Sequence, residues 1–257
     1  MDLGLQGKSA FVCGASQGLG YAIAEALAEE GARVGLFARN SETLAARAEA
    51  LAARGLKAEA LAGDMGDFAT VERALSRFGE ADIVVCNTGG PPAGEPDHVD
   101  PDLWRGQFEA MALNQMRLVS HCLPAMRARK FGRILNVAST SVVEPIGYLP
   151  YSGPLRAALA NWLKNLSDAV ARDGITVNTL LTGSFATERI DKLNAAAATS
   201  RGVTIDKIVA ETSAAIPAGR YGSPREFADV AAFLASARAS YVTGQMIAID
   251  GGAMRSM

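Results

Sequence analysis

Residues 9–20 read SAFVCGASQGLG and join a short apolar run to a glycine-rich turn. The run Ser9–Cys13 is typical of a buried strand, and Gly18–Glu29 is typical of a helix that ends at Gly31. Glycines between a strand and a helix allow a tight turn and a close approach of the backbone to a pyrophosphate, which binds the free N–H groups of the helix start. Strand, turn and helix, with a second strand about twenty residues on, predict a dinucleotide-binding unit.

Outward from this turn, short apolar runs continue to alternate with longer alanine-rich stretches. Parallel strands joined by right-handed helical crossovers produce this order. We therefore predict one doubly wound α/β domain over residues 1–257, with a Rossmann-type parallel sheet of about seven strands and helices on both faces. Residues 184–219 interrupt the alternation and are predicted to form a partly helical flap. The other strands are predicted at Arg33–Phe37, Lys57–Leu61, Asp82–Cys86, Arg133–Val137, Ile175–Thr179 and Met246–Ile249, and the other helices at Glu42–Arg54 (capped by Ser41), Asp67–Arg77, Pro101–Ala128, Leu155–Ala171 and Pro224–Leu234.

The composition excludes several classes of protein. The 257 residues are 49% hydrophobic and 20% charged, with a net charge of −2, which excludes a disordered chain and argues against a nucleic-acid binder. The sequence has no run of about 18 apolar residues, so no membrane span is predicted. The first residues are not expected to form a signal peptide. Three cysteines and two histidines lack metal-type spacing. We therefore expect no metal site, and buried thiols in a reducing compartment, the cytoplasm.

Further motifs follow the predicted strands. The segment Asn87-Thr88-Gly89-Gly90 follows the fourth strand, Val137-Ala138-Ser139 ends the fifth, and Asn178 precedes Thr182, Gly183 and Thr187. Together with the Gly-x-x-x-Gly-x-Gly spacing of the first turn, these motifs identify a resemblance to the short-chain dehydrogenase/reductase family, in its 3-oxoacyl-(acyl-carrier-protein) reductase-like branch. The segments Tyr241-Val242-Thr243-Gly244-Gln245 and Asp250-Gly251-Gly252 resemble the C-terminal region of that family. Thr182 stands where the family has a proline.

The end of the second strand bears on the choice of dinucleotide. An acid there binds the ribose 2′-hydroxyl of NAD, whereas a nearby arginine accommodates the 2′-phosphate of NADP. The acid position reads Ala38 and Arg39 follows, which favours NADP(H) over NAD(H), with added donors from Ser16 and Gln17. The resemblance implies that Asp64 and Met65 border the adenine, and that the backbone near Phe185 positions the nicotinamide. The expected cofactor-binding residues are Gly14, Ser16, Gln17, Gly18, Leu19, Gly20, Arg39, Asp64, Met65, Asn87, Thr88, Gly89, Arg156, Thr182, Gly183, Phe185 and Thr187.

The catalytic set departs from the family pattern. The resemblance implies a helix asparagine, a serine that holds the carbonyl oxygen, a tyrosine that donates the proton and a lysine four residues later. Asn114 and Ser139 fit the first two roles, but Ser152 and Arg156 occupy the tyrosine and lysine positions, and Tyr151 is one residue out of register. Since Gly153-Pro154 argues against a regular helix, Tyr151 is expected in a turn. Ser152 and Tyr151 are both candidate donors, with Tyr148 as a third option and Thr140 or Ser141 as substitutes for Ser139.

The function implied by the resemblance is an NADP(H)-dependent ketone reductase or alcohol dehydrogenase working by hydride transfer. The main alternative is a catalytically impaired relative that binds NADP(H) as a sensor or regulatory module; an enzyme with altered chemistry is a third. The flap is expected to cover a mostly apolar carbonyl or alcohol substrate. Its cations Arg189, Lys192, Arg201 and Lys207 are candidates for attracting an anionic tail or for solvated helix faces. The resemblance also implies a homotetramer.

Overall fold

A computed structural model describes residues 1–92 and 94–256. These residues form a seven-stranded, entirely parallel sheet in the order β3-β2-β1-β4-β5-β6-β7. The strands are β1 (Ser9–Cys13), β2 (Arg33–Ala38), β3 (Ala58–Ala62), β4 (Ile83–Cys86), β5 (Gly132–Ser139), β6 (Ile175–Thr182) and β7 (Met246–Ile249). The predicted doubly wound α/β fold is confirmed, and the strands are displaced from their expected bounds by no more than a few residues at either end.

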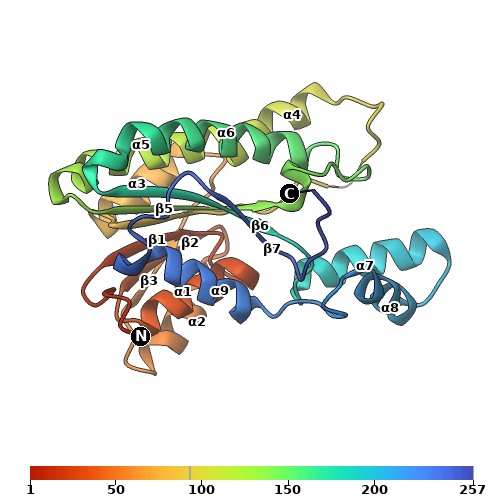
Figure 1. Cartoon of the computed structure of the whole chain (residues 1–257), viewed down its shortest axis with the longest axis horizontal. Helices are drawn as coiled ribbons and strands as arrows, with labels where there is room; N and C mark the ends of the chain where they lie inside the picture. The colour runs from red at the N-terminus through yellow and green to blue at the C-terminus, as the bar shows by residue number, and fades with distance from the viewer. Residues whose placement is uncertain (93, 257) are drawn as a thin grey trace.

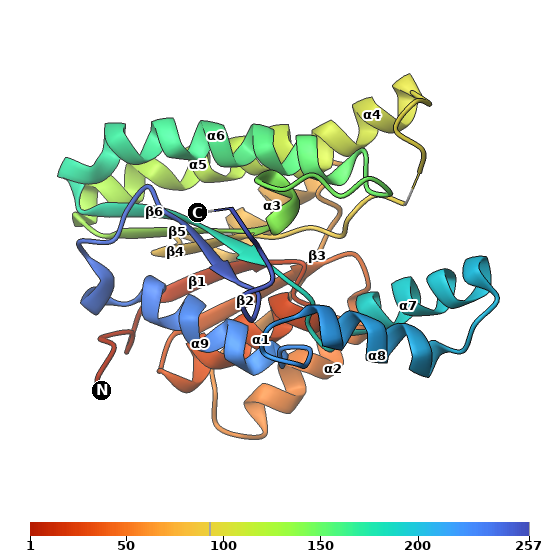
Figure 2. The same ribbon diagram turned by 45° about the vertical axis from the view of Figure 1, so that its right-hand side comes forward.

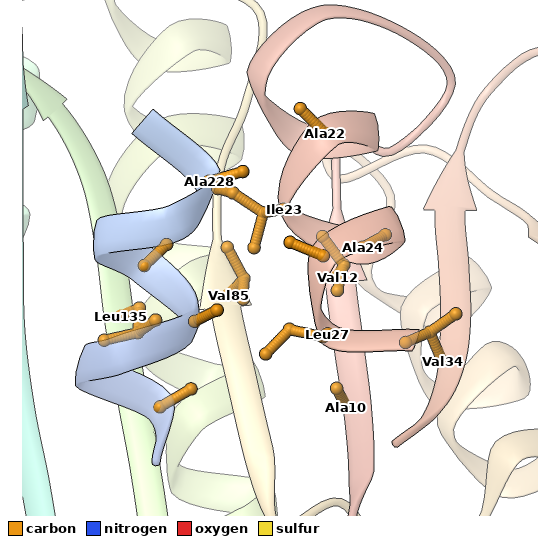
Figure 3. Packing of buried hydrophobic residues seen from close by; sticks show 14 of the residues in the cluster. Ala10, Val12, Ala22, Ile23, Ala24, Leu27, Val34, Val85, Leu135 and Ala228 are labelled. Carbon is orange, nitrogen blue, oxygen red and sulfur yellow. The ribbon is translucent and has the colours of Figure 1, made fainter. Parts of the chain in front are cut away.

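Helices cover both faces of the sheet (Figure 1). The first face carries α1 (Gly18–Glu29), α2 (Ser41–Ala52) and α9 (Pro224–Ala235), and the second carries α3 (Phe68–Phe78), α5 (Asn114–Arg129) and α6 (Ser152–Val170). On the first face, Ile23 and Leu27 of α1 and Ala228 of α9 pack over the strands (Figure 3). These side chains are fully buried, so apolar burial on both faces holds the sheet in place.

The helix predicted at Pro101–Ala128 is wrong in one respect, because it is not continuous. It consists of α4 (Pro101–Phe108), a π-helical turn η1 (Glu109–Leu113) and α5. A π turn inserts an extra residue into the helical repeat, and such turns occur frequently at functional sites. Short 3-10 turns lie at η2 (Thr140–Val142), η3 (Ala171–Asp173) and η4 (Ala237–Ala239).

Two helix starts also differ from the prediction. The α2 cap is Asn40 rather than Ser41, because the Asn40 side chain accepts a hydrogen bond from the backbone N–H of Thr43 at 2.8 Å. Helix α6 begins at Ser152 and continues through Gly153 and Pro154. The expectation of an irregular backbone there is wrong, because a proline in the first turn of a helix forgoes no intrahelical hydrogen bond.

The segment 184–219 contains α7 (Glu188–Arg201) and α8 (Ile205–Ala215), which pack against each other as a helical arm. In both views the arm extends away from the sheet (Figures 1 and 2): α7 leads outward from the carboxyl end of β6, and α8 returns. The base of α7 and the end of α8 therefore lie near the strand ends, where Ile216 at the end of α8 approaches Gly251 after β7. Among the described residues, no helix is long and apolar enough to cross a membrane.

Candidate active site

The glycine turn packs tightly between β1 and α1. Gly14 and Gly18 have φ angles of +61° and +58°, a region that side-chain-bearing residues rarely adopt. A Cβ on Gly20 would lie 2.3 Å from the carbonyl oxygen of Gly14, and a Cβ on Gly14 would lie 2.6 Å from Nδ2 of Asn87. All three positions therefore require glycine, and Leu19 lies between two of them at the start of α1.

Asn87 joins the turn to β4, because its Nδ2 donates to the carbonyl oxygen of Cys13 at 3.2 Å. The strand order changes direction between β1 and β4. In an open parallel sheet the carboxyl ends of such neighbouring strands border the crevice in which ligands bind. Thr88 and Gly89 continue from Asn87 along this edge, and no atom lies within 4 Å of where a Cβ on Gly89 would be. The turn and the segment after β4 thus share one crevice.

Arg39 follows β2 directly and is exposed. Gln17 is exposed and Ser16 half-buried at the same end of the sheet. Sequence reasoning missed Arg47 of α2, whose Nε donates to the carbonyl oxygen of Ser16 at 3.2 Å and whose guanidinium lies 4.5 Å from the Tyr21 ring centroid. Arg47 therefore holds the glycine turn from the side of α2. It lies 31 residues beyond Ser16 in the chain, and no sequence motif relates it to the turn.

The segment after β3 contains the two residues expected near the adenine. Asp64 is exposed, and its Oδ1 accepts from the backbone N–H of Gly66 at 2.9 Å. Met65 is buried, and its carbonyl oxygen accepts from Nδ2 of Asn114 at 2.8 Å. Asn114 thereby ties α5 to this segment.

Ser139 is the last residue of β5, and its Oγ accepts from the backbone N–H of Ser141 at 3.1 Å. The first turn of α6 packs directly on this loop. A Cβ on Gly153 would lie 3.0 Å from the carbonyl oxygen of Ser141, so glycine allows the close approach. The loop that carries Ser139 and the start of α6 that carries Ser152 therefore lie together.

Ser152 and Arg156 face each other along α6. Arg156 donates from Nε to Oγ of Ser152 at 3.2 Å and from Nη1 to the carbonyl oxygen of Val137 at 2.9 Å. Residues i and i+4 of a helix share a face, which explains the first bond. Burial, and to a lesser extent the charge of Arg189, lower the pKa of Arg156 to about 10. The side chain remains a cation near neutral pH, and both of these bonds go to uncharged oxygens.

Tyr151 points elsewhere. Its ring is buried against Trp104, with ring centroids 5.3 Å apart, and its hydroxyl donates to the carbonyl oxygen of His98 at 3.5 Å. Tyr148 is 60% exposed. The structure thus brings Ser152, not Tyr151 or Tyr148, into contact with Arg156.

A small cavity beside Arg156 is lined in part by Thr88, Met111 and Gln115. Asn114 is absent from this lining, since its amide contacts Met65 instead. Gln115 is 1% exposed, and neither its Oε1 nor its Nε2 has a hydrogen-bond partner in the described residues. A buried amide without partners costs about 1–3 kcal/mol, so this cavity offers polar groups to a ligand or a water. The π turn directly before Asn114 determines which of these neighbours faces the cavity, and sequence periodicity does not predict such a turn.

The base of the arm closes the crevice from the other side. Thr187 caps α7, and its methyl group would lie 3.6 Å from a Cβ on Gly18. Thr182 donates to the carbonyl oxygen of Ala138 at 3.1 Å, and a Cβ on Gly183 would lie 2.6 Å from that of Asp250. Phe185 is buried in edge contact with Phe227. Thr182, Gly183, Phe185 and Thr187, which were predicted to bind the cofactor, therefore pack closely where the arm joins the sheet.

These features fit a dinucleotide. The glycine turn leaves no room for a side chain, the start of α1 carries free N–H groups without a side-chain cap, and such a helix start binds a pyrophosphate. No group of three or more His, Cys, Asp or Glu side chains that could hold a metal occurs within residues 1–92 and 94–256.

Comparisons with known proteins agree with this geometry. The family model described as enoyl-(acyl carrier protein) reductase matches residues 14–254. The chain belongs to the short-chain dehydrogenase/reductase family. An NADPH-dependent reductase of Bacillus subtilis is 34% identical, over 97% of this chain and 99% of that protein. A 3-oxoacyl-(acyl-carrier-protein) reductase of Vibrio cholerae is 33% identical, over 97% of this chain and 98% of the relative.

Solved structures of the short-chain dehydrogenase/reductase family resemble the whole chain. The L-sorbose reductase of Gluconobacter frateurii, complexed with NADPH and L-sorbose, superposes with a TM-score of 0.93 at 33% identity and covers 100% of both chains. The predicted family and its reductase-like branch are confirmed. This member of the short-chain dehydrogenase/reductase family is therefore an oxidoreductase, and the sensor alternative finds no support in these relatives.

Proposed function

We propose that the protein is an NADP(H)-dependent ketone reductase, similar to the 3-oxoacyl reductases, that uses Ser152 and Arg156 in place of the tyrosine and lysine of its family. The observation that carries this proposal is the hydrogen bond from Arg156 to Ser152 at the crevice edge. Relatives named as NADPH-dependent reductases support the choice of cofactor.

The glycine turn (Gly14, Ser16, Gln17, Gly18, Leu19 and Gly20) would hold the pyrophosphate side of the cofactor, and Arg39 its 2′-phosphate. Asp64 and Met65 would border the adenine, and Asn87, Thr88 and Gly89 with Thr182, Gly183, Phe185 and Thr187 would enclose the nicotinamide half. When bound, the reduced nicotinamide supplies a hydride to the carbonyl carbon. Arg156 would also contact the neighbouring ribose, because it lies at the family's lysine position.

The protein's own groups handle the proton. Because Oγ of Ser152 accepts from Arg156, its hydroxyl hydrogen is free to be donated to the carbonyl oxygen of a ketone. The guanidinium stays charged and stabilises the negative charge that develops on that oxygen. Ser139, at the end of β5, would hold the same oxygen, and Asn114 would act indirectly by fixing α5 to the segment after β3.

The test is NADPH oxidation with a panel of ketones. Loss of a general acid lowers the rate by about 10²–10⁴-fold, so Ser152→Ala is expected to lower kcat by about 10² or more. Tyr151→Phe, which removes only the hydroxyl that contacts His98, serves as the matched control and is expected to stay within about threefold. A large loss in Tyr151→Phe with little change in Ser152→Ala would make Tyr151 the donor. Tight NADPH binding with no turnover on any ketone would overturn the reductase proposal.

We also propose a cytoplasmic homotetramer. Phe108 of α4 and Leu113 of η1 are exposed, as are Tyr241 and Met246, the first residue of the edge strand β7. These faces are suited to contacts between copies. Free, buried cysteines support a reducing compartment. Light scattering at micromolar concentration checks the assembly; a monomer would refute the proposed tetramer.

The segment 184–219 is proposed as the substrate flap of a single domain.

A further inference from the structure

Arg189 lies at the base of α7, one residue into the helix, and reaches across the crevice. Its Nη2 contacts the carbonyl oxygen of Pro91 at 3.4 Å. A Cβ on Gly90 would lie 2.6 Å from that same Nη2 and 3.0 Å from Cζ. Because Gly90 has no side chain, the guanidinium rests against the segment that continues from Asn87 and Thr88.

The Arg189 side chain is exposed, and no carboxylate of the described residues neutralises its guanidinium. Within residues 1–92 and 94–256 its one hydrogen bond goes to a neutral carbonyl, and it forms no ion pair. Its charge makes the smaller contribution, after burial, to the lowered pKa of Arg156. An anion bound at Arg189 would accept charge-assisted hydrogen bonds from the guanidinium and would lessen the repulsion between the two cations.

The other cations of the arm are differently placed. Arg201 pairs with Glu211 of α8 at 2.7 Å. Lys192 is three residues further along α7 than Arg189, and Lys207 belongs to α8. Helix α7 leads away from the sheet (Figure 2). Of the four cations that the sequence offered for attracting an anionic group, Arg189 is thus the one whose contacts in the described residues reach the crevice.

We propose that Arg189 binds a carboxylate of the substrate close to the reacting carbonyl, so that the preferred substrates are oxo acids. Arginine matches a planar carboxylate through two parallel hydrogen bonds. This inference rests on the proposed reductase function and narrows its substrate class. It sets the protein apart from an enzyme whose substrate is charged only at the distant phosphate of a pantetheine arm.

The experiment compares acids with their methyl esters, which lack the negative charge and carry one additional methyl group. The probes are 2-oxo-4-phenylbutanoate and 4-oxo-4-phenylbutanoate, each with its ester, and the readout is the acid-to-ester ratio of kcat/KM. In Arg189→Gln, losing a bidentate charged contact is expected to lower this ratio by about 10- to 100-fold for at least one pair. Lys192→Gln, on the same helix, is the matched control and is expected to leave the ratio unchanged.

Fluorescence titration of NADPH into each variant separates the two anions that Arg189 could hold. An unchanged Kd in Arg189→Gln supports the substrate carboxylate. A Kd that rises about tenfold while the acid-to-ester ratio stays constant would assign Arg189 to the cofactor phosphates and overturn the inference. A wild-type protein that turns over both esters as well as both acids would also overturn it.

Failure of the proposed function has a different signature, namely no NADPH oxidation with any of the four compounds. Calorimetric titration of the two acids into the complex with NADP⁺ then tests whether Arg189 binds a carboxylate, independently of turnover. Binding of an acid that weakens about tenfold or more in Arg189→Gln supports the carboxylate site; no binding of either acid overturns it.

Discussion

At the scale of single residues, the site is proposed to place Ser152 and Arg156 where its family has a tyrosine and a lysine. A phenol has a pKa of about 10 and becomes a useful acid with a cation beside it. Ser152 is a much weaker acid, and Arg156 never gives up its proton under ordinary conditions. The pair keeps a positive charge beside a hydroxyl group, to which Arg156 donates a hydrogen bond, but the hydroxyl belongs to a weaker acid and the cation is permanent.

Arg39 is proposed to determine the cofactor preference at the same scale. It is exposed at the end of β2, so it can meet a phosphate without a rearrangement of the core. A charge-assisted hydrogen bond contributes about 1.5–3 kcal/mol, so Arg39→Ala is expected to raise the Kd of NADPH by about 10- to 100-fold and to leave the Kd of NADH within about twofold. Fluorescence titration of both cofactors measures this. An equal loss for both would show that Arg39 does not read the 2′-phosphate.

At the scale of elements, the site forms where the first turns of three helices contact neighbouring loops. The start of α1 abuts the turn after β1, the start of α6 abuts the loop after β5, and the start of α7 approaches the glycine turn. Each contact occurs at a glycine: Gly20, Gly153 and Gly18. A single added carbon therefore separates elements whose functional groups must act together.

Gly20→Ala tests this view. Its Cβ would lie 2.3 Å from the Gly14 carbonyl oxygen and 2.8 Å from Nδ2 of Asn87, so the turn must open and its pyrophosphate contacts weaken. We expect the Kd of NADPH to rise by about tenfold or more, as for loss of one hydrogen bond. Gly106→Ala in α4 is the control, because no atom lies within 4 Å of the added carbon. It is expected to stabilise the helix by about 0.5–1 kcal/mol and to leave binding unchanged.

At the scale of the whole molecule, burial of the sheet on both faces controls the reactivity of the thiols. Cys13 of β1, Cys86 of β4 and Cys122 of α5 belong to one apolar cluster between the sheet and the second helical layer. Burial raises the pKa of all three thiols, and that of Cys122 to about 12. The reactive thiolate therefore forms only when the layers separate.

We expect a thiol reagent at pH 8 to label none of the three cysteines in the native protein and all of them in urea. The labelling rate should follow the rate of opening. The thiol pKa values are higher in the folded than in the unfolded protein. The three buried, protonated thiols therefore favour the folded state fully below about pH 8.5, and the free energy of unfolding declines as the pH rises above that value. A thiol that is labelled at once in the native protein would contradict this account of its burial.

The amino-acid sequence by itself determined the parallel sheet, its strand number and the glycine turn. These features depend on local periodicity and on turn chemistry, which are properties of short segments. The family resemblance predicts that Ser152 and Arg156 occupy its tyrosine and lysine positions. Their mutual contact follows from the sequence spacing, because residues i and i+4 share a face of a helix. The prediction of NADP(H) rested mainly on Ala38 and Arg39, at a strand end that the local pattern could locate.

Only the tertiary structure decided which side chains meet. It turned Tyr151 toward Trp104, tied Asn114 to Met65, and left Gln115 facing the cavity through a π turn that no periodicity indicates. It also separated Arg189 from the other cations of the arm by bringing it against Gly90. These outcomes depend on packing between segments far apart in the chain, where a shift of one residue in a helix turns a side chain by about 100°.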